Sequence, residues 1–259
     1  MAEAPLHLAR RLRAGETVIC AWSSLPDTGF VAMLAGQGFD AVNLDMQHGG
    51  HTEQSVWDGI AAIVGLGKPV MVRVPVGRFD MAARALDFGA DAVIAPMINS
   101  PADARAFAAA MKYPPVGERS WGPTRGITLR GISGGNAYLA SANADTLSFA
   151  MIETRGALDA LDDILATRGI DAVFVGPADF SIAWTGGERL DPKLDAMMEA
   201  IAHIAACAKA HGKLAGIFAA DPAMTQRYVA MGYGLVAAGF DAALVRAGAD
   251  AVLAAARGD

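Results

Sequence analysis

Two acidic residues follow short apolar runs at separate points of the chain. Glu153 comes directly after residues 149–152, and Asp179 comes shortly after residues 172–175. Carboxylate oxygens bind divalent cations, and two carboxylates close together repel unless a cation or a proton intervenes. The pair is therefore a candidate site for one divalent metal ion, and a structural salt bridge with Arg73 is the alternative. Carboxylate ligands suit Mg²⁺ and Mn²⁺, and Co²⁺ or Zn²⁺ also stay open.

Further polar residues follow the second and third apolar runs. His48 comes shortly after Asp45 and just before two glycines, which favours a general base over a capping or solvated loop residue. Arg73 is a charge in a run otherwise suited to burial, and burying it is costly unless it meets an anion. We expect that anion to be a ligand carboxylate, with Glu153 as the alternative.

Two more residues near these runs have open roles. His51 is expected to cap or flank the next helix rather than to react. Asp87 is expected either to reach another subunit or to brace His48.

Short apolar runs alternate with longer amphipathic ones along the whole chain, which is typical of parallel βαβ units. Near-continuous apolar character suits strands that are buried on both sides. Strands are expected at residues 18–22, 41–44, 70–74, 92–95, 148–152, 172–175, 213–217 and 235–238. Helices are expected to begin near residues 28, 52, 81, 101, 157, 193, 221 and 241.

This count predicts a (β/α)8 TIM barrel, an α/β fold, as a single domain over residues 1–259. A doubly wound open sheet is the alternative, but Ser23-Ser24-Leu25-Pro26 after the first strand is not a glycine-rich nucleotide loop. In a barrel the loops after the strands form the active site, so the polar residues above are expected to converge.

Other residues are expected to lie away from that site. Asp40, Asp91 and Asp171 each stand between a helix-ending glycine phrase and a strand, so they belong on the opposite, stabilising face. Residues 118–143 are too many for a plain connection. They form either a functional loop or an oligomer contact.

Composition excludes some classes of function. The chain is 53% hydrophobic and 19% charged, with a net charge of -6, which argues against a nucleic-acid partner. No apolar stretch runs uninterrupted for a membrane span, so no membrane partner is expected and the protein is expected in the cytoplasm.

Six phrases, in order, resemble the HpcH/HpaI aldolase family of metal-dependent class II pyruvate aldolases, and the resemblance covers nearly the whole chain. The phrases are Gly38-Phe39-Asp40 through Asp45-Met46-Gln47-His48-Gly49, Val72-Arg73-Val74-Pro75, Leu86-Asp87-Phe88-Gly89-Ala90, Lys112-Tyr113-Pro114-Pro115-Val116-Gly117-Glu118-Arg119, Ile152-Glu153-Thr154, and Val175-Gly176-Pro177-Ala178-Asp179-Phe180-Ser181. The resemblance implies a (β/α)8 barrel whose last helix packs on a neighbouring subunit, usually in a homohexamer built as a trimer of dimers.

The resemblance also implies roles for individual residues. Glu153 and Asp179 match the family's metal ligands, Arg73 its contact to the keto-acid oxygens, and His48 its acid/base residue. Asp45 and Asp87 match residues that support this chemistry. The backbone of Gly176, Pro177 and Ala178 matches the stretch around the pyruvate carboxylate.

Two positions depart from the family pattern. Gln47 stands where many members carry glutamate, and Met151 stands where a polar residue is common. Both changes alter the polarity expected of the pocket, whereas the matching metal ligands are intact.

The reaction implied is the reversible cleavage of a 4-hydroxy-2-oxo acid to pyruvate and an aldehyde. The aldehyde pocket is expected from residues 22–26, which include Trp22, and residues 48–52. No lysine follows a core strand, which disfavours an imine mechanism. The alternatives are an oxaloacetate decarboxylase or CoA-ester lyase that uses the same metal-enolate site, and a non-catalytic binding protein.

Overall fold

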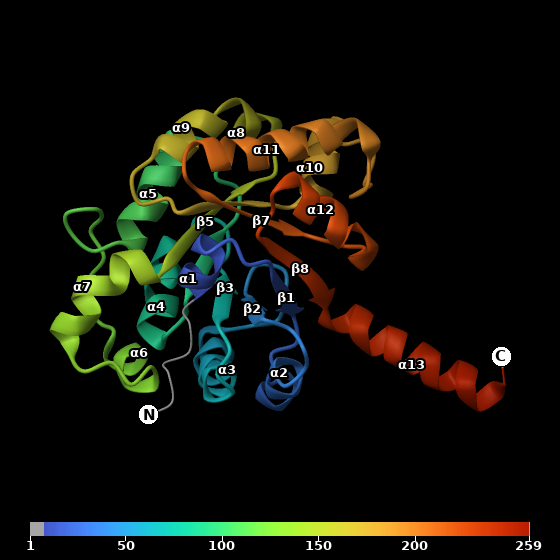
Figure 1. Cartoon of the computed structure of the whole chain (residues 1–259), viewed down its shortest axis with the longest axis horizontal. Coiled ribbons are helices and arrows are strands. Elements are labelled where there is room, and N and C mark those ends of the chain that lie inside the picture. Colours follow the sequence, from blue (N-terminus) through green and yellow to red (C-terminus); the bar gives the residue numbers. More distant parts are fainter. Residues whose placement is uncertain (1–7, 259) are drawn as a thin grey trace.

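The computed structural model describes residues 8–258 and forms one closed barrel of eight parallel strands in chain order (Figure 1). The strands are β1 Val18–Ser23, β2 Ala41–Asp45, β3 Val70–Arg73, β4 Ala92–Ala95, β5 Leu147–Ile152, β6 Ala172–Val175, β7 Leu214–Phe218 and β8 Leu235–Phe240. Each lies within two residues of its expected bounds, so the predicted (β/α)8 barrel is confirmed and the open-sheet alternative is wrong.

Helices surround the barrel and fill the connections between strands. They are α1 Leu8–Arg13, α2 Thr28–Ala35, α3 Glu53–Gly65, α4 Phe79–Phe88, α5 Pro101–Met111, α6 Thr124–Leu129, α7 Gly135–Asp145, α8 Arg155–Asp159, α9 Leu161–Ala166, α10 Pro177–Trp184, α11 Met198–Ala210, α12 Thr225–Met231 and α13 Asp241–Arg257. Two short 3₁₀ helices, η1 Asp195–Met197 and η2 Pro222–Met224, precede α11 and α12. No helix in residues 8–258 is long and apolar enough to cross a membrane.

The alternating side chains of the strands make two apolar layers. One set, which includes Cys20, Met71, Phe149 and Phe174, fills the barrel interior. The other set points outward, and its residues pack with the helices in a larger cluster. Because both faces of each strand are covered, the near-continuous apolar runs in the sequence are explained.

Two regions differ from the expected pattern. Residues 118–143 contain α6 and most of α7 instead of a long loop, and Tyr113, Tyr138 and Ala142 form a small apolar cluster with them. Asp179 lies in the first turn of α10, which begins directly after β6. The short apolar phrase after Gly176 carries too few residues for a clear helical period, so α10 was not expected. The helix expected near residue 193 begins as η1 at Asp195 and continues as α11 from Met198.

The three aspartates excluded from the site lie where the chain enters β2, β4 and β6. Each carboxylate accepts a hydrogen bond from a backbone N–H at the start of the preceding strand. The donors are Ile19 N to Asp40 at 2.9 Å, Val70 N to Asp91 at 2.8 Å, and Ser148 N to Asp171 at 2.9 Å. This arrangement ties neighbouring strands together at the amino-terminal face, as expected for residues that stabilise the barrel.

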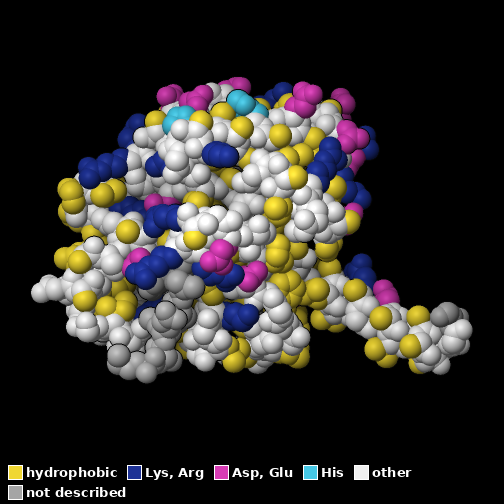
Figure 2. Space-filling model, viewed as in Figure 1, with side chains coloured by type: hydrophobic (Ala, Val, Ile, Leu, Met, Phe, Trp, Pro, Cys, Tyr) yellow, Lys and Arg dark blue, Asp and Glu magenta, His cyan; other side chains and the backbone are white. Residues whose placement is uncertain are grey.

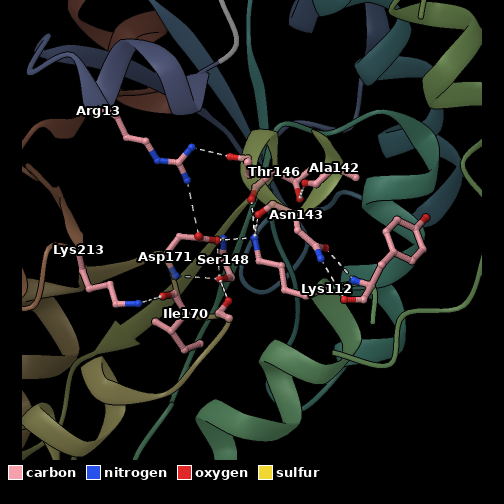
Figure 3. A network of polar contacts seen from close by, with 12 residues as sticks. Arg13, Lys112, Ala142, Asn143, Thr146, Ser148, Ile170, Asp171 and Lys213 are labelled. Atoms are coloured by element: carbon pink, nitrogen blue, oxygen red, sulfur yellow. Dashed lines mark hydrogen bonds and ion pairs between the residues drawn. The ribbon is translucent and has the colours of Figure 1, made fainter. Parts of the chain in front are cut away.

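Asp171 also anchors a buried polar network (Figure 3). The Lys112 side chain is 1% exposed, and its Nζ lies 2.6 Å from Asp171 Oδ2. The same ammonium donates to the carbonyl oxygens of Asn143 and Thr146 at 2.9 and 2.6 Å. Lys112 therefore joins the ends of α5 and α7 to the entrance of β6.

Replacing this lysine by methionine should destabilise the barrel strongly. Lys112→Met leaves a partly buried carboxylate and two carbonyl groups short of a donor, and loss of one partner of a buried pair typically costs about 3–5 kcal/mol. Urea unfolding followed by circular dichroism measures the loss. Lys193→Met is the matched control, because the Lys193–Asp221 pair is exposed and such pairs contribute about 0–1 kcal/mol. Equal losses in the two variants would contradict the importance of this network.

Candidate active site

A cavity of about 200 Å³ opens at the carboxyl ends of the strands. Eight of the predicted site residues line it, namely Trp22, Asp45, His48, Arg73, Gly176, Pro177, Ala178 and Asp179. Ser24, Met151, Phe174, Phe218 and Phe240 complete the lining. The predicted convergence at the end of the barrel is therefore present in the structure.

Asp45 and Arg73 form a buried ion pair at the base of this cavity. They are register partners at the ends of β2 and β3. Arg73 Nε donates to Asp45 Oδ1 at 2.9 Å, and Nη2 donates to Oδ2 at 2.6 Å. Burial favours the neutral form of Asp45, but the Arg73 pair outweighs it and holds the pKa of Asp45 below its ordinary value. Neither bond uses Nη1, so that nitrogen remains for a ligand.

The expectation for Arg73 omitted this partner. A ligand carboxylate or Glu153 was expected, whereas the structure pairs Arg73 with Asp45. Trp22 supports the pair, because its indole N–H donates to Asp45 Oδ2 at 3.2 Å and its ring centroid lies 4.8 Å from the Arg73 guanidinium carbon. The guanidinium is thus held in one orientation before any ligand binds.

Glu153 follows β5 and is 2% exposed. Its Oε1 accepts a hydrogen bond from Met97 N at 2.8 Å. Burial raises the pKa of Glu153 to about 7, and the nearby Asp179 carboxylate contributes, while Met97 N–H and Arg73 oppose the rise. A buried carboxyl beside a second acid is a place where a cation would be stabilised.

Gly176 packs directly against the Glu153 carboxyl group. A Cβ at Gly176 would lie 2.7 Å from Glu153 Oε2 and 3.0 Å from the Met151 methyl carbon, so only glycine leaves the present space. Gly176 is the N-cap of α10, and Ala178 and Asp179 lie in the first turn. The first N–H groups of a helix have no intrahelical acceptors, and they favour anionic ligands.

His48 lies at the exposed edge of the cavity. Asp45 Oδ1 accepts from Gln47 N at 3.0 Å and from His48 N at 3.4 Å. Asp45 therefore binds both the Arg73 side chain and the backbone of this loop. Gln47 Oε1 is buried and has no hydrogen-bond partner among the described residues.

Asp87 does not join the other predicted residues. It lies near the end of α4, where the chain returns to the amino-terminal face, and its Oδ1 accepts from Arg119 Nη2 at 2.7 Å. Within this chain Asp87 therefore pairs with Arg119 and not with His48, and the expectation that it reaches another subunit stays a prediction. A helix that starts beside the site runs back along the barrel, so residues at its two ends lie at opposite faces.

Several residues near the cavity were missing from the sequence-based site. The aromatic side chains of Phe174, Phe218 and Phe240 form much of its wall, but apolar strand residues carry no signal that separates wall from core. Met97 supplies the N–H bound by Glu153, and its φ of 55° is in the left-handed region. Such a conformation is uncommon outside glycine and often marks functional sites.

The residues present fit a divalent cation. Glu153 Oε2 is not used in the Met97 bond, and Asp179 is close enough to raise the pKa of Glu153. Within residues 8–258 no group of three or more His, Cys, Asp and Glu side chains could hold a metal. Two carboxylates are typical of Mg²⁺ sites whose other ligands are water and substrate oxygens.

This arrangement gathers four chemical elements at one end of the barrel. Asp179, the Arg73 guanidinium, the start of α10 and the His48 imidazole line the cavity, and the buried Glu153 carboxyl, the second candidate ligand for a cation, lies just behind Gly176. Such a set can bind an anionic carbonyl compound, stabilise negative charge on its oxygen, and move a proton.

Comparison with known proteins identifies the family. A model of the HpcH/HpaI aldolase/citrate lyase family matches residues 19–247. Hydroxypyruvate/pyruvate aldolase of Rhizorhabdus wittichii is 38% identical over 243 residues, which cover 94% of this chain and 95% of that protein. 2-keto-3-deoxy-L-rhamnonate aldolase of Salmonella schwarzengrund is 33% identical over 244 residues, which cover 94% of this chain and 90% of that protein.

A crystal structure of an HpcH/HpaI aldolase/citrate lyase family protein from Burkholderia cenocepacia J2315 superposes with a TM-score of 0.85 at 29% identity, over 96% of this chain and 98% of that one. The match to the family extends over all eight strands except the first residue of β1. The chain therefore belongs to the HpcH/HpaI aldolase/citrate lyase family and is a carbon–carbon lyase.

Proposed function

We propose that this protein is a divalent-metal-dependent aldolase that reversibly cleaves a 4-hydroxy-2-oxo acid to pyruvate and an aldehyde. The observation that carries the proposal is the buried Glu153 carboxyl near Asp179, packed behind Gly176, which lines the cavity together with Asp179 and the Asp45–Arg73 pair. Aldolase relatives at 33–38% identity over most of the chain support the choice of reaction.

Glu153 and Asp179 would hold the cation, either Mg²⁺ or Mn²⁺, and oxygens of water and of the 2-oxo acid would supply its other ligands. When bound, such an ion polarises the ketone and stabilises the enolate that carbon–carbon cleavage leaves behind. The cavity-lining residues include no lysine in the described part of the chain, so an amine for an imine mechanism is missing there.

The protein's own groups position the substrate and move its proton. The Arg73 guanidinium, already oriented by Asp45, binds the oxygen on which negative charge develops. The N–H groups of Ala178 and Asp179 at the start of α10 bind the carboxylate. His48 accepts the 4-hydroxyl proton during cleavage and returns it during condensation.

Pyruvate in D₂O tests the enolate step without knowledge of the aldehyde. Proton NMR of the methyl group should show deuteration by the chelator-treated protein only after Mg²⁺ or Mn²⁺ is added. Glu153→Gln should abolish this exchange, because the amide keeps the oxygen that accepts from Met97 but loses the charge that binds metal. Undiminished exchange in Glu153→Gln, or no exchange in the unchanged protein with either ion, would contradict the proposal.

Arg73→Lys should slow the same exchange by about a hundredfold while leaving it dependent on metal, because one oriented donor to the developing oxyanion is lost. A lysine also cannot reproduce the two bonds to Asp45. Arg78→Lys is the matched control, since the Arg78–Asp80 pair is exposed and contributes nothing to the cavity lining. An equal effect of the two substitutions would remove Arg73 from the proposed mechanism.

The pKa of Glu153 gives metal binding a dependence on pH. With a pKa of about 7 in the metal-free protein, the carboxyl is mostly protonated at pH 6 and the cation must displace that proton. The apparent affinity for Mn²⁺ should therefore be about tenfold weaker at pH 6 than at pH 8. Isothermal titration calorimetry measures this change, and a constant affinity across the range would contradict the assignment.

The pH dependence of the free energy of unfolding provides an independent check on the raised pKa of Glu153. The folded protein raises the pKa of Glu153 above its ordinary value of 4.5, so the metal-free protein is stabilised while the carboxyl stays protonated. That stabilisation is lost as the pH rises through about 7. Glu153→Gln has no proton to lose there, and its unfolding free energy should decline less between pH 5 and 8.

We also propose that α13 packs on a second copy of this chain. The helix projects away from the barrel in Figure 1, and its Leu244, Val245, Val252 and Leu253 side chains are exposed. In Figure 2, hydrophobic side chains appear along this helix and on the barrel beside its base. An eighth helix normally covers its own barrel, so a projecting one favours exchange between copies. The resemblance to the family implies a hexamer.

Charges on the apolar stripe of α13 test this assembly. The Val245→Asp/Val252→Asp double variant should lower the molar mass measured by light scattering on a size-exclusion column. Association through α13 would require two unpaired carboxylates to be buried in the contact between copies, which is costly. Asp250→Lys on the polar side of the same helix should leave the mass unchanged. If the double variant kept the mass of the unchanged protein, α13 would not be the contact.

A further inference from the structure

Asp241, the first residue of α13, has a fully buried carboxylate beside the cavity. Four donors surround it: Ser24 N at 2.5 Å, Ser24 Oγ at 2.7 Å, Leu25 N at 2.8 Å and Ala242 N at 2.8 Å. A buried charge is tolerated when such donors replace water, and charge-assisted bonds are stronger than neutral ones. The carboxylate thus joins the β1–α2 loop to the junction of β8 and α13.

This junction forms part of the cavity wall. Ser24, which donates two of the bonds, lines the cavity, and so does Phe240, the residue before Asp241. The carboxylate therefore connects two lining residues that are more than 200 positions apart in sequence. Ser24 is held by this one side chain through two hydrogen bonds.

The loop that carries His48 rests on the same segment. Gly50 N donates to Ser24 O at 2.8 Å, and a Cβ on Gly49 would lie 2.9 Å from Ser24 Cα. Next to it, the buried His51 ring lies 3.1 Å from both Ser23 Oγ and Ser55 Oγ. A shift of Ser24 would therefore move the β2–α3 loop as well.

The order of the strands around the barrel indicates separate sides of the cavity for the 2-oxo acid and the aldehyde. Glu153 and Asp179 follow β5 and β6, whereas Ser24, His48 and Asp241 follow β1, β2 and β8. In a closed barrel of eight strands these groups lie on opposite sides of the opening. With the 2-oxo acid on the side of Glu153, the aldehyde must approach from the side of Ser24 and His48.

We infer that Asp241 is a positioning residue that shapes the aldehyde side of the cavity by fixing Ser24 and Leu25. This inference rests on the proposed aldolase function, because it assigns one side of the same cavity to the second reactant. It adds to the sequence-based site a residue that touches no substrate and acts through the two loops.

Asp241→Asn tests the inference. The asparagine amide has nearly the same shape as the carboxylate. Its NH₂ group is a donor, however, and it would face N–H donors that bind a carboxylate oxygen in the unchanged protein. In the condensation of pyruvate with glycolaldehyde, the KM for glycolaldehyde should rise about tenfold, since small misplacements of a binding group have effects of this order or larger. Deuteration of the pyruvate methyl group, which needs no aldehyde, should stay within about twofold of the unchanged protein.

Asp27→Asn is the matched control in the same loop. Asp27 caps α2 by accepting from Phe30 N at 2.7 Å, and asparagine caps helices equally well. Both rates should be unchanged in this variant. Ser24→Ala is the second variant, because it removes only the hydroxyl donor to Asp241 and should raise the same KM in the same direction by a smaller factor, even if Asp241→Asn fails to fold.

The outcomes separate the inference from the proposed function. An unchanged KM for glycolaldehyde in Asp241→Asn, or in Ser24→Ala if that is the variant that folds, would overturn the inference. Equal losses of methyl deuteration and condensation would also overturn it, since they would indicate general damage to the site. Absence of metal-dependent deuteration in the unchanged protein would contradict the proposed function itself, and the inference with it.

Discussion

Closure of the parallel barrel is the constraint on which the rest of the structure depends. Eight strands that run in one direction and pair in a ring leave no free edge, and all their carboxyl ends meet at one opening. Residues that are more than 100 positions apart, such as Asp45 and Asp179, thereby line one small cavity. The two apolar layers keep this scaffold rigid, so the polar groups at the opening can be held in fixed positions.

Acidic residues act differently at the two ends of this barrel. At the amino-terminal face, Asp40, Asp91 and Asp171 each accept from a neighbouring strand and pair with a basic side chain. Their charges are compensated by the protein, which suits a structural role. At the other face, Asp45 is compensated by Arg73, whereas Glu153 accepts a hydrogen bond from Met97 N–H and has both a second acid and the Arg73 charge nearby, with burial as the largest influence on its pKa. Under the proposed function, this carboxyl, which has no ion-pair partner of its own among residues 8–258, is where the cation would bind.

The cavity also shows how apolar surroundings serve a polar reaction. Trp22, Phe174, Phe218 and Phe240 line the cavity together with Arg73, and charges interact more strongly in apolar surroundings than in bulk water. Met151 extends this wall toward Glu153, where the family pattern has a polar residue. The departure noted in the sequence thus places an apolar side chain on the Glu153 side of the cavity, where burial is the main cause of the raised pKa of Glu153.

Local patterns in the sequence determined most of the scaffold. Apolar runs and helix-ending glycines depend on residues close in sequence, so all eight strands and the strand-end positions of Glu153 and Arg73 could be predicted. Only the tertiary structure decided the partners: Asp45 for Arg73, Met97 N for Glu153, Arg119 for Asp87, and Ser24 for Asp241. It also decided that α13 leaves the barrel (Figure 1). These choices depend on which elements become neighbours and at what register, which residues adjacent in sequence do not specify.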